Sequence, residues 1–141
     1  MENLFFQLSL TLCLIDKKLT LSLMPDSFAI CKLSPDSAIP SWVVDGEFFS
    51  ITKTPDELSI VCNEKIVPPG VAAEREWAAF KIDGPLDFAM TGILSSIASP
   101  LADARISVFV ISTYDTDYIL VKRENVEKVF KALSNFHITG G

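Results

Sequence analysis

Residues 83–121, DGPLDFAMTGILSSIASPLADARISVFVISTYDTDYILV, predict a turn, a helix, a strand, a second turn and a strand, in that order. The segment begins with Asp83-Gly84-Pro85, which cannot continue a strand. Apolar residues then recur with the three- and four-residue spacing of one helix face, at Met90, Ile93, Leu94, Ile97, Ala98 and Leu101. A helix with one apolar face needs a surface to pack on, and we expect the strands to supply it.

An apolar hairpin follows this helix. Residues 106–111 and 118–121 are its expected strands, and the polar turn Ser112–Asp117 joins them. A helix on a hairpin forms a layered unit whose polar residues gather at the connections, where binding residues are often found. Pro100 lies inside the helix, which we expect over about 86–104, and should kink or end it.

The chain divides into an N-terminal appendage, two similar units and a tail, at residues 1–16, 17–76, 77–138 and 139–141. The second unit has the order strand, helix, strand, strand, helix, short strand, which is ferredoxin-like. The first unit repeats this order with at most short helical turns. Beyond the hairpin, the expected strands are 19–23, 28–33, 48–53, 58–62, 77–82 and 136–138, and the last helix is about 123–135. The predicted fold class is α+β, with antiparallel sheets and helices on one face.

Several segments resemble the ACT-domain proteins. They are Leu86-Asp87-Phe88, Thr91-Gly92-Ile93-Leu94, Pro100-Leu101-Ala102 and, above all, Ile111–Val121. The resemblance is strong over 77–133 and weaker over 19–64. It points to small tandem-ACT proteins of bacteria, related to the cytosolic arginine sensors of animals and to aspartate kinase regulatory domains, and it implies tandem βαββαβ units.

Composition limits the partners of the chain. Its 141 residues carry 12 basic and 18 acidic side chains, and no basic run exceeds two residues, so we expect no nucleic acid partner. Cys13, Cys31 and Cys62 are far apart and His137 is the single histidine, so we expect no metal and no cofactor. Buried, reduced thiols in a cytoplasmic protein are the expected state, with a redox-sensitive thiol as the alternative.

The N-terminal run from Leu4 to Ile15 is apolar, yet no basic residue precedes it and Lys17-Lys18 follow it. This is the reverse of a secretory signal, and the run is too short to span a bilayer. We therefore expect no membrane partner.

Sequence patterns typical of enzymes are missing. There is no Gly-x-Ser-x-Gly elbow and no glycine-rich phosphate-binding loop. Asp115 and Asp117, two residues apart beside a strand, tend to point to opposite sides and so do not form an acid–base pair. We expect no enzymatic activity.

The helix start and the turn together suit a zwitterion. Gly84 and Gly92 lie near the expected helix start, where unpaired N–H groups and the positive end of the helix dipole accept a carboxylate. The turn Ser112–Asp117 offers hydroxyl groups and carboxylates to an ammonium group. From the residues alone, a purely structural role for these glycines and for Asp115 is an equal alternative.

The ACT resemblance favours binding. ACT domains bind amino acids and similar small ligands between ACT units, and the matching positions here are Thr91, Gly92, Ile93, Thr113, Tyr114 and Asp117. With Gly84 and Ser112, these residues form the candidate site. Met90 stands where arginine-binding relatives have an acidic residue, so the resemblance does not extend to arginine selectivity.

We therefore predict a non-catalytic sensor or regulatory protein that binds an amino acid at an ACT–ACT interface. Two alternatives remain open: an interaction or dimerisation module without a ligand, and a detached regulatory subunit of an amino-acid-biosynthetic enzyme. Exposed strands at the sheet edges predict a homodimer with two-fold symmetry.

Overall fold

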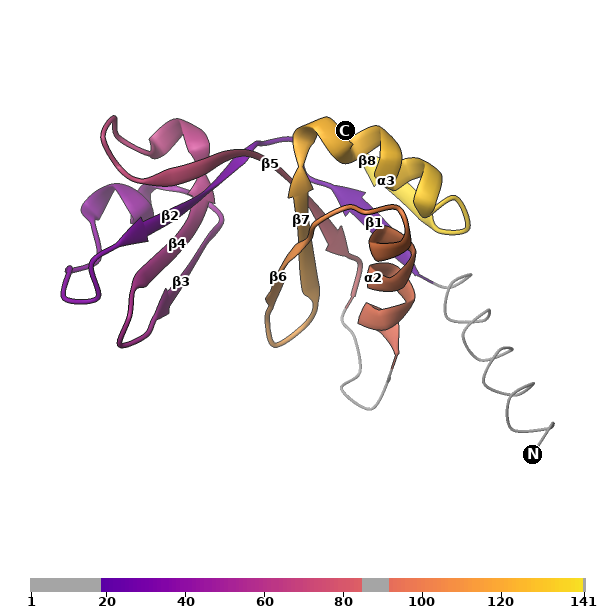
Figure 1. Ribbon diagram of the computed structural model, residues 1–141, viewed down its shortest axis with the longest axis horizontal. Helices are drawn as coiled ribbons and strands as arrows, with labels where there is room; N and C mark the ends of the chain where they lie inside the picture. The colour runs from indigo at the N-terminus through magenta and orange to yellow at the C-terminus, as the bar shows by residue number, and fades with distance from the viewer. Residues whose placement is uncertain (1–18, 85–91, 141) are drawn as a thin grey trace.

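Two lobes share one long strand in the computed structural model, which describes residues 19–84 and 92–140. This strand, β5 (Ala73–Ile82), runs from the lobe at the left of Figure 1 into the lobe at the right. The described strands form a single eight-stranded sheet that passes through both lobes. We call the left lobe the first unit and the right lobe the second unit.

The first unit consists of strands in the order β3-β4-β2-β5, with β5 contributing its N-terminal half. Short 3-10 turns stand where a ferredoxin-like unit has helices. These elements are β2 (Phe28–Leu33), η1 (Ser41–Asp45), β3 (Phe49–Lys53), β4 (Leu58–Asn63) and η2 (Glu64–Ile66). Its core is the buried apolar cluster Ala29, Cys31, Val43, Leu58, Ile60, Cys62 and Val67. The unit therefore keeps the ferredoxin-like strand order with eroded helices, as the sequence predicts.

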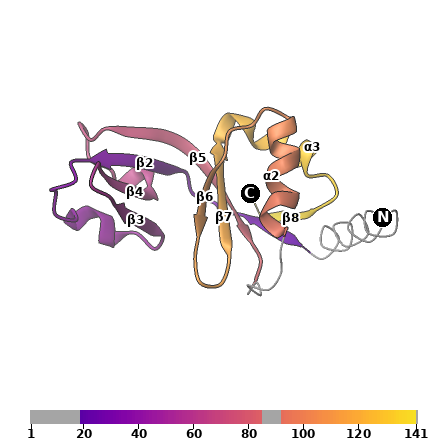
Figure 2. The same cartoon turned by 60° about the horizontal axis from the view of Figure 1, so that its bottom comes forward.

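The second unit has the strand order β6-β7-β5-β1-β8 and two helices on one face of the sheet (Figure 2). Its elements are β1 (Thr20–Leu23), α2 (Ile93–Asp103), β6 (Phe109–Ser112), β7 (Asp117–Lys122), η3 (Arg123–Asn125), α3 (Val126–Ala132) and β8 (His137–Gly140). Alternate residues of β1, β5 and β7 point to this face and pack against Ile93, Ile97 and Leu101 of α2. The predicted α+β class and the helices on one face are confirmed.

Strand β1 pairs with the second unit, although it lies within the range 17–76 expected for the first. It runs antiparallel to β5, with Leu21 opposite Ile82, and parallel to β8, with Leu21 opposite Ile138. The strand pairs here because its alternating leucines are buried in the helix-covered core of the second unit. The expectation of purely antiparallel sheets is wrong for the β1–β8 pair.

The boundaries of several elements differ from the sequence expectation. Residues 106–108 precede β6 and are not in a strand, and residues 139–140, expected in the tail, extend β8. Helix α2 contains Pro100 and continues to Asp103, because a proline removes only one hydrogen bond and the helix ends within a turn of it. Residues 85–91, the expected start of this helix, lie outside the described residues.

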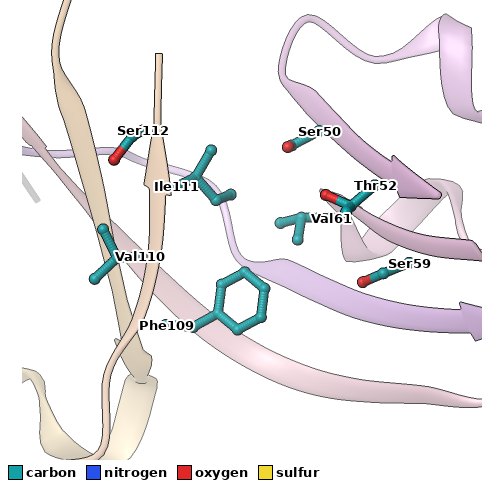
Figure 3. Close-up of a pocket in the computed structure, with 8 residues that line it drawn as sticks. All are labelled: Ser50, Thr52, Ser59, Val61, Phe109, Val110, Ile111 and Ser112. Atoms are coloured by element: carbon teal, nitrogen blue, oxygen red, sulfur yellow. The ribbon is translucent and has the colours of Figure 1, made fainter. Parts of the chain in front are cut away.

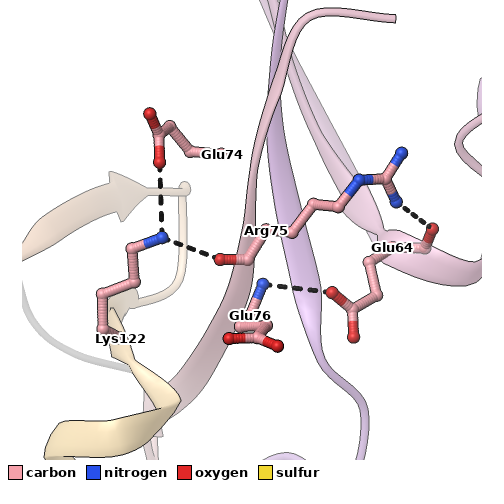
Figure 4. Close-up of polar contacts among 5 residues, drawn as sticks. All are labelled: Glu64, Glu74, Arg75, Glu76 and Lys122. Carbon is pink, nitrogen blue, oxygen red and sulfur yellow. Dashed lines mark hydrogen bonds and ion pairs between the residues drawn. The ribbon is translucent and has the colours of Figure 1, made fainter. Parts of the chain in front are cut away.

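A local bend in β5 separates its two halves. Glu76 has a φ of 64°, and the register with β2 shifts there. The Glu64 carboxylate accepts a hydrogen bond from the Glu76 N–H (3.0 Å), while Lys122 donates to the Arg75 carbonyl (2.8 Å) and forms an ion pair with Glu74 (Figure 4). Residues of both units therefore hold the bend.

The two units also meet on the helix-free face of the second unit's strands. The Tyr118 and Phe48 rings lie 4.8 Å apart between centroids, and Phe48 packs edge-on against Phe28 (5.4 Å). Phe28, Ala79 and Leu120 are buried in the same cluster. This aromatic contact fixes the position of β7 relative to the first unit.

Candidate functional site

One threonine side chain closes the turn between β6 and β7. The Thr113 N–H donates to the Thr116 carbonyl (2.8 Å), and the Thr113 hydroxyl accepts from the Thr116 N–H (3.2 Å). Thr116 is buried, and its hydroxyl donates to the carbonyl of Ile82 at the end of β5. The turn is therefore fastened to β5, while Tyr114 and Asp115 at its tip are exposed.

The turn between β3 and β4 repeats this arrangement in the first unit. The Thr54 N–H donates to the Glu57 carbonyl (2.9 Å), and the Thr54 hydroxyl accepts from the Glu57 N–H (3.1 Å). Both turns have the same length. Lys53 pairs with Leu58 across the first turn, and Ser112 pairs with Asp117 across the second. The strand pairing therefore aligns the two units residue by residue.

This alignment places Asp117 at the position that Leu58 occupies in the first unit. Leu58 is 2% exposed and belongs to the first core. Asp117 shares a strand face with Ile119 and Val121, which are buried against the helices. The second unit thus carries a half-buried carboxylate at the edge of its core, where the first unit carries a core leucine.

Helix α2 begins at the same end of the second unit as this carboxylate (Figure 1). Gly92 precedes the helix with a φ of 82°, which a residue with a Cβ adopts only with strain, and its carbonyl accepts from the Ser96 N–H (2.8 Å). The N–H groups of the first helical turn have no acceptor within the helix. Figure 1 shows that the start of α2, the end of β5 and the β6–β7 turn lie at the same end of the second unit, which we call the turn end.

A hollow of about 260 Å³ opens at the turn end. Its lining residues come from the end of β5, the turn and the start of β7: Lys81, Gly84, Thr113, Asp115, Thr116 and Tyr118. Lys81 is paired with Tyr118 across the strands, so both side chains lie on the face without helices. We call this the polar hollow.

The structure divides the predicted site residues among different surroundings. Gly84 and Thr113 line the polar hollow, Gly92 and Ile93 begin α2, and Asp117 begins β7 on the helix-covered face. Tyr114 is exposed at the tip of the turn. Thr91 lies outside the described residues.

Ser112, also predicted for the site, faces a different cavity. It lines a groove of about 190 Å³ with Phe109 and Ile111 of β6 and with Ser50, Thr52, Ser59 and Val61 of the first unit (Figure 3). The structure brings Ser112 next to Asp117 through the β-ladder, but its surroundings belong to the contact between the units.

Sequence analysis missed two residues of the turn end. Thr116 fastens the turn to β5, and its role became visible only with the hydrogen bond to Ile82. Lys81 could have been noticed as a charged residue in the otherwise apolar strand Trp77–Ile82, about three residues before the candidate residue Gly84. Asp115, which the sequence alone leaves open to a structural role, lines the polar hollow.

Comparison with known proteins identifies the family. A family model described as an ACT domain matches residues 72–135, and a model described as an N-terminal domain matches residues 26–70. A crystal structure of a protein from Agobacterium tumefaciens is 40% identical, with a TM-score of 0.82, over 87% of this chain and 93% of that one. Residues 72–135 of the chain are an ACT domain. The ACT match includes all of β5 and contains the turn end.

Other relatives of this ACT-domain protein have regulatory names. The cytosolic arginine sensor for mTORC1 subunit 1 of Bos taurus is 33% identical in an alignment of 99 residues that covers 62% of this chain and 30% of the sensor. The ligand-free regulatory subunit of aspartate kinase from Thermus thermophilus has a TM-score of 0.59 at 13% identity, over 81% of this chain and 95% of that one. The second likeness shows a shared fold only. An ACT domain with a sensor among its relatives supports a regulatory, ligand-binding role.

Two further properties concern the described residues alone. None of their helices combines the length and the apolar character that crossing a membrane requires. No group of three potential metal-ligating side chains comes together among them.

Proposed function

We propose that this ACT-domain protein binds an amino acid or a similar zwitterion at the turn end of the second unit and thereby regulates another protein. The observation that carries the proposal is Asp117. The first unit has the core residue Leu58 at the equivalent position. A carboxylate at this position weakens the core, so a function outside the core would explain why it is there. Receiving a ligand's ammonium group is such a function.

The start of α2 offers the complementary group for a carboxylate. The N–H groups of its first turn point toward the turn end, and the helix dipole is positive there. Gly92 has no side chain to obstruct the approach to these N–H groups. An α-amino acid carries both charges within one small molecule, so it suits an anionic residue and a helix start at the same end of one unit.

The identity of the amino acid is a separate question. The bovine relative is named an arginine sensor, but Met90 replaces the acidic residue expected of arginine-binding relatives. Without that partner a guanidinium group loses a charge-assisted hydrogen bond. We therefore propose an amino acid ligand without preference for arginine.

We further propose a non-catalytic homodimer in the cytoplasm, in which the ligand lies between ACT units. Among the described strands β3, β6 and β8 are each paired on one side only, and such edges are commonly covered by a partner. Light scattering at micromolar concentration, with and without amino acids, should give twice the 15.5 kDa of one chain. A mass of one chain in both conditions would contradict the dimer.

A thermal-shift screen against the twenty amino acids tests the ligand. A ligand that binds only the native state stabilises it by about 2.7 kcal/mol at a concentration a hundredfold above its dissociation constant. We expect at least one amino acid to raise the melting temperature of the wild type, and Asp117→Asn to remove the effect. Asp56→Asn, in the matching turn of the first unit, is the control and should leave it unchanged.

The absence of a shift with every amino acid would contradict the proposed function. It would leave the alternative that the turn end is an interaction surface without a small ligand. An Asp117→Asn protein that no longer folds would instead assign Asp117 a structural role.

A further inference from the structure

The polar hollow has a charge of each sign on its lining. Lys81 projects from the end of β5 and Asp115 from the tip of the turn, and both are exposed. Within residues 19–84 and 92–140 neither side chain takes part in an ion pair. The ammonium and the carboxylate therefore face the same cavity of about 260 Å³ without neutralising each other.

The polar hollow lies on the other side of the sheet from Asp117. Lys81 alternates with Phe80 and Ile82, which are buried in the helix-covered core, so it projects from the opposite face. Tyr118 is its cross-strand partner and follows Asp117 directly in β7. A ligand in the polar hollow would thus have contacts different from those of a ligand at Asp117.

The remaining lining residues shape the cavity. The hydroxyl groups of Thr113 and Thr116 are already used in holding the turn, so they fix the position of Asp115. The Tyr118 ring forms an apolar wall and rests on Phe48 of the first unit. Gly84 adds no side chain to the space. Among the described residues, Lys81 and Asp115 are therefore the charged groups that the lining presents to a ligand.

We propose that the polar hollow is a second binding site for an amino acid zwitterion, with its carboxylate on Lys81 and its ammonium on Asp115. A simple anion would be repelled by Asp115 and a simple cation by Lys81, whereas a zwitterion is attracted at both ends. The inference rests on the proposed function for the amino-acid class of its ligand, but it assigns different residues on a different face.

Modified ligands test each end of this assignment. The twenty amino acids, their methyl esters, which lack the carboxylate, and their N-acetyl derivatives, which lack the ammonium, are titrated by calorimetry into the wild type, Lys81→Gln and Asp115→Asn. We expect both variants to weaken amino acid binding at this site at least tenfold. The ester should bind the wild type more weakly than the amino acid does. Lys81→Gln should bind the ester and the amino acid with equal affinity, because it lacks the partner of the carboxylate. The N-acetyl derivative should likewise bind the wild type more weakly than the amino acid does. Asp115→Asn should bind the two with equal affinity.

The first unit supplies matched control variants. Its strand pairing places Lys32 opposite Ser59 as Lys81 is opposite Tyr118, and Asp56 occupies the position of Asp115 in its turn. Lys32→Gln and Asp56→Asn therefore remove the same charges at equivalent places. Both controls should bind amino acids as the wild type does, and circular dichroism should show all four variants folded.

The outcomes separate this inference from the proposed function. Loss of binding in Asp117→Asn together with unchanged binding in Lys81→Gln and Asp115→Asn would overturn the inference and leave the proposed site intact. The reverse pattern would support the inference and overturn the site at Asp117. Two molecules bound per chain, each lost with its own variants, would support both. No binding of any amino acid to the wild type would overturn both.

Discussion

Replacing Asp117 with leucine should stabilise the unliganded protein while removing its ligand binding. The repeat supplies the reason, because Leu58 at the equivalent position is 2% exposed in a well-packed core. Full burial of a leucine side chain is worth about 1.5–3 kcal/mol. Asp117 is half-buried, so about 1 kcal/mol is the expected gain for Asp117→Leu. For a chain of this size that corresponds to a rise in melting temperature of about 3 °C.

Urea unfolding followed by circular dichroism measures this change, and the amino acid screen measures the loss of binding. The reciprocal variant, Leu58→Asp, is the matched comparison. It removes a buried apolar side chain and leaves a carboxylate in a core, so it should cost at least about 3 kcal/mol.

A destabilised Asp117→Leu protein would refute this reasoning. A loss above about 1 kcal/mol would mean that the carboxylate makes native contacts that support the fold. Asp117 would then be a structural residue, and its difference from Leu58 would carry no functional information.

Three further variants test the start of α2, the β1–β8 pair and the core of the first unit. Gly92→Val forces a β-branched residue into a φ of 82°, so urea unfolding should show a loss of about 1–2 kcal/mol and the amino acid shift should disappear. A Cβ at Gly140 would collide with the Leu23 carbonyl, so Gly140→Ala should speed hydrogen exchange in β1 and β8, and unchanged exchange would contradict their pairing. Hydrogen bonding to Cys31 and burial raise the pKa of the Cys62 thiol. The contribution of this thiol to the free energy of unfolding is therefore complete at a pH below the ordinary thiol pKa of about 9, and it falls as the pH rises above that value. Urea titrations at pH 7 and pH 10 should show this fall in the wild type and a smaller one in Cys62→Ala.

Periodicity predicted most of the fold because its elements bury one face each. The leucines of β1 and the stripe of Ile93, Ile97 and Leu101 in α2 show which side is buried, and that is enough to predict a strand and a helix. Periodicity does not say which strands pair. The insertion of β1 between β5 and β8 depends on contacts between distant parts of the chain, so local patterns place it in the wrong unit.

The candidate site was predictable to the extent that turns have recognisable residues. Thr113 and Asp117 bracket the turn where the sequence places it, and Gly92 adopts the backbone conformation that favours glycine. The face of the sheet on which a side chain lies depends on the strand register. A shift of one residue moves every side chain of the strand to the opposite face. Lys81 therefore could be assigned to the polar hollow only when its pairing with Tyr118 was known.

A nuclear magnetic resonance titration with the amino acids that raise the melting temperature tests most directly whether the turn end binds the ligand. Amide signals in a ¹H–¹⁵N spectrum report on each residue separately. We expect the largest shifts at residues 92–95 and 113–118, with the first-unit turn at residues 54–57 unchanged. Shifts confined to the first unit, or no shifts at saturating amino acid, would contradict ligand binding at the turn end.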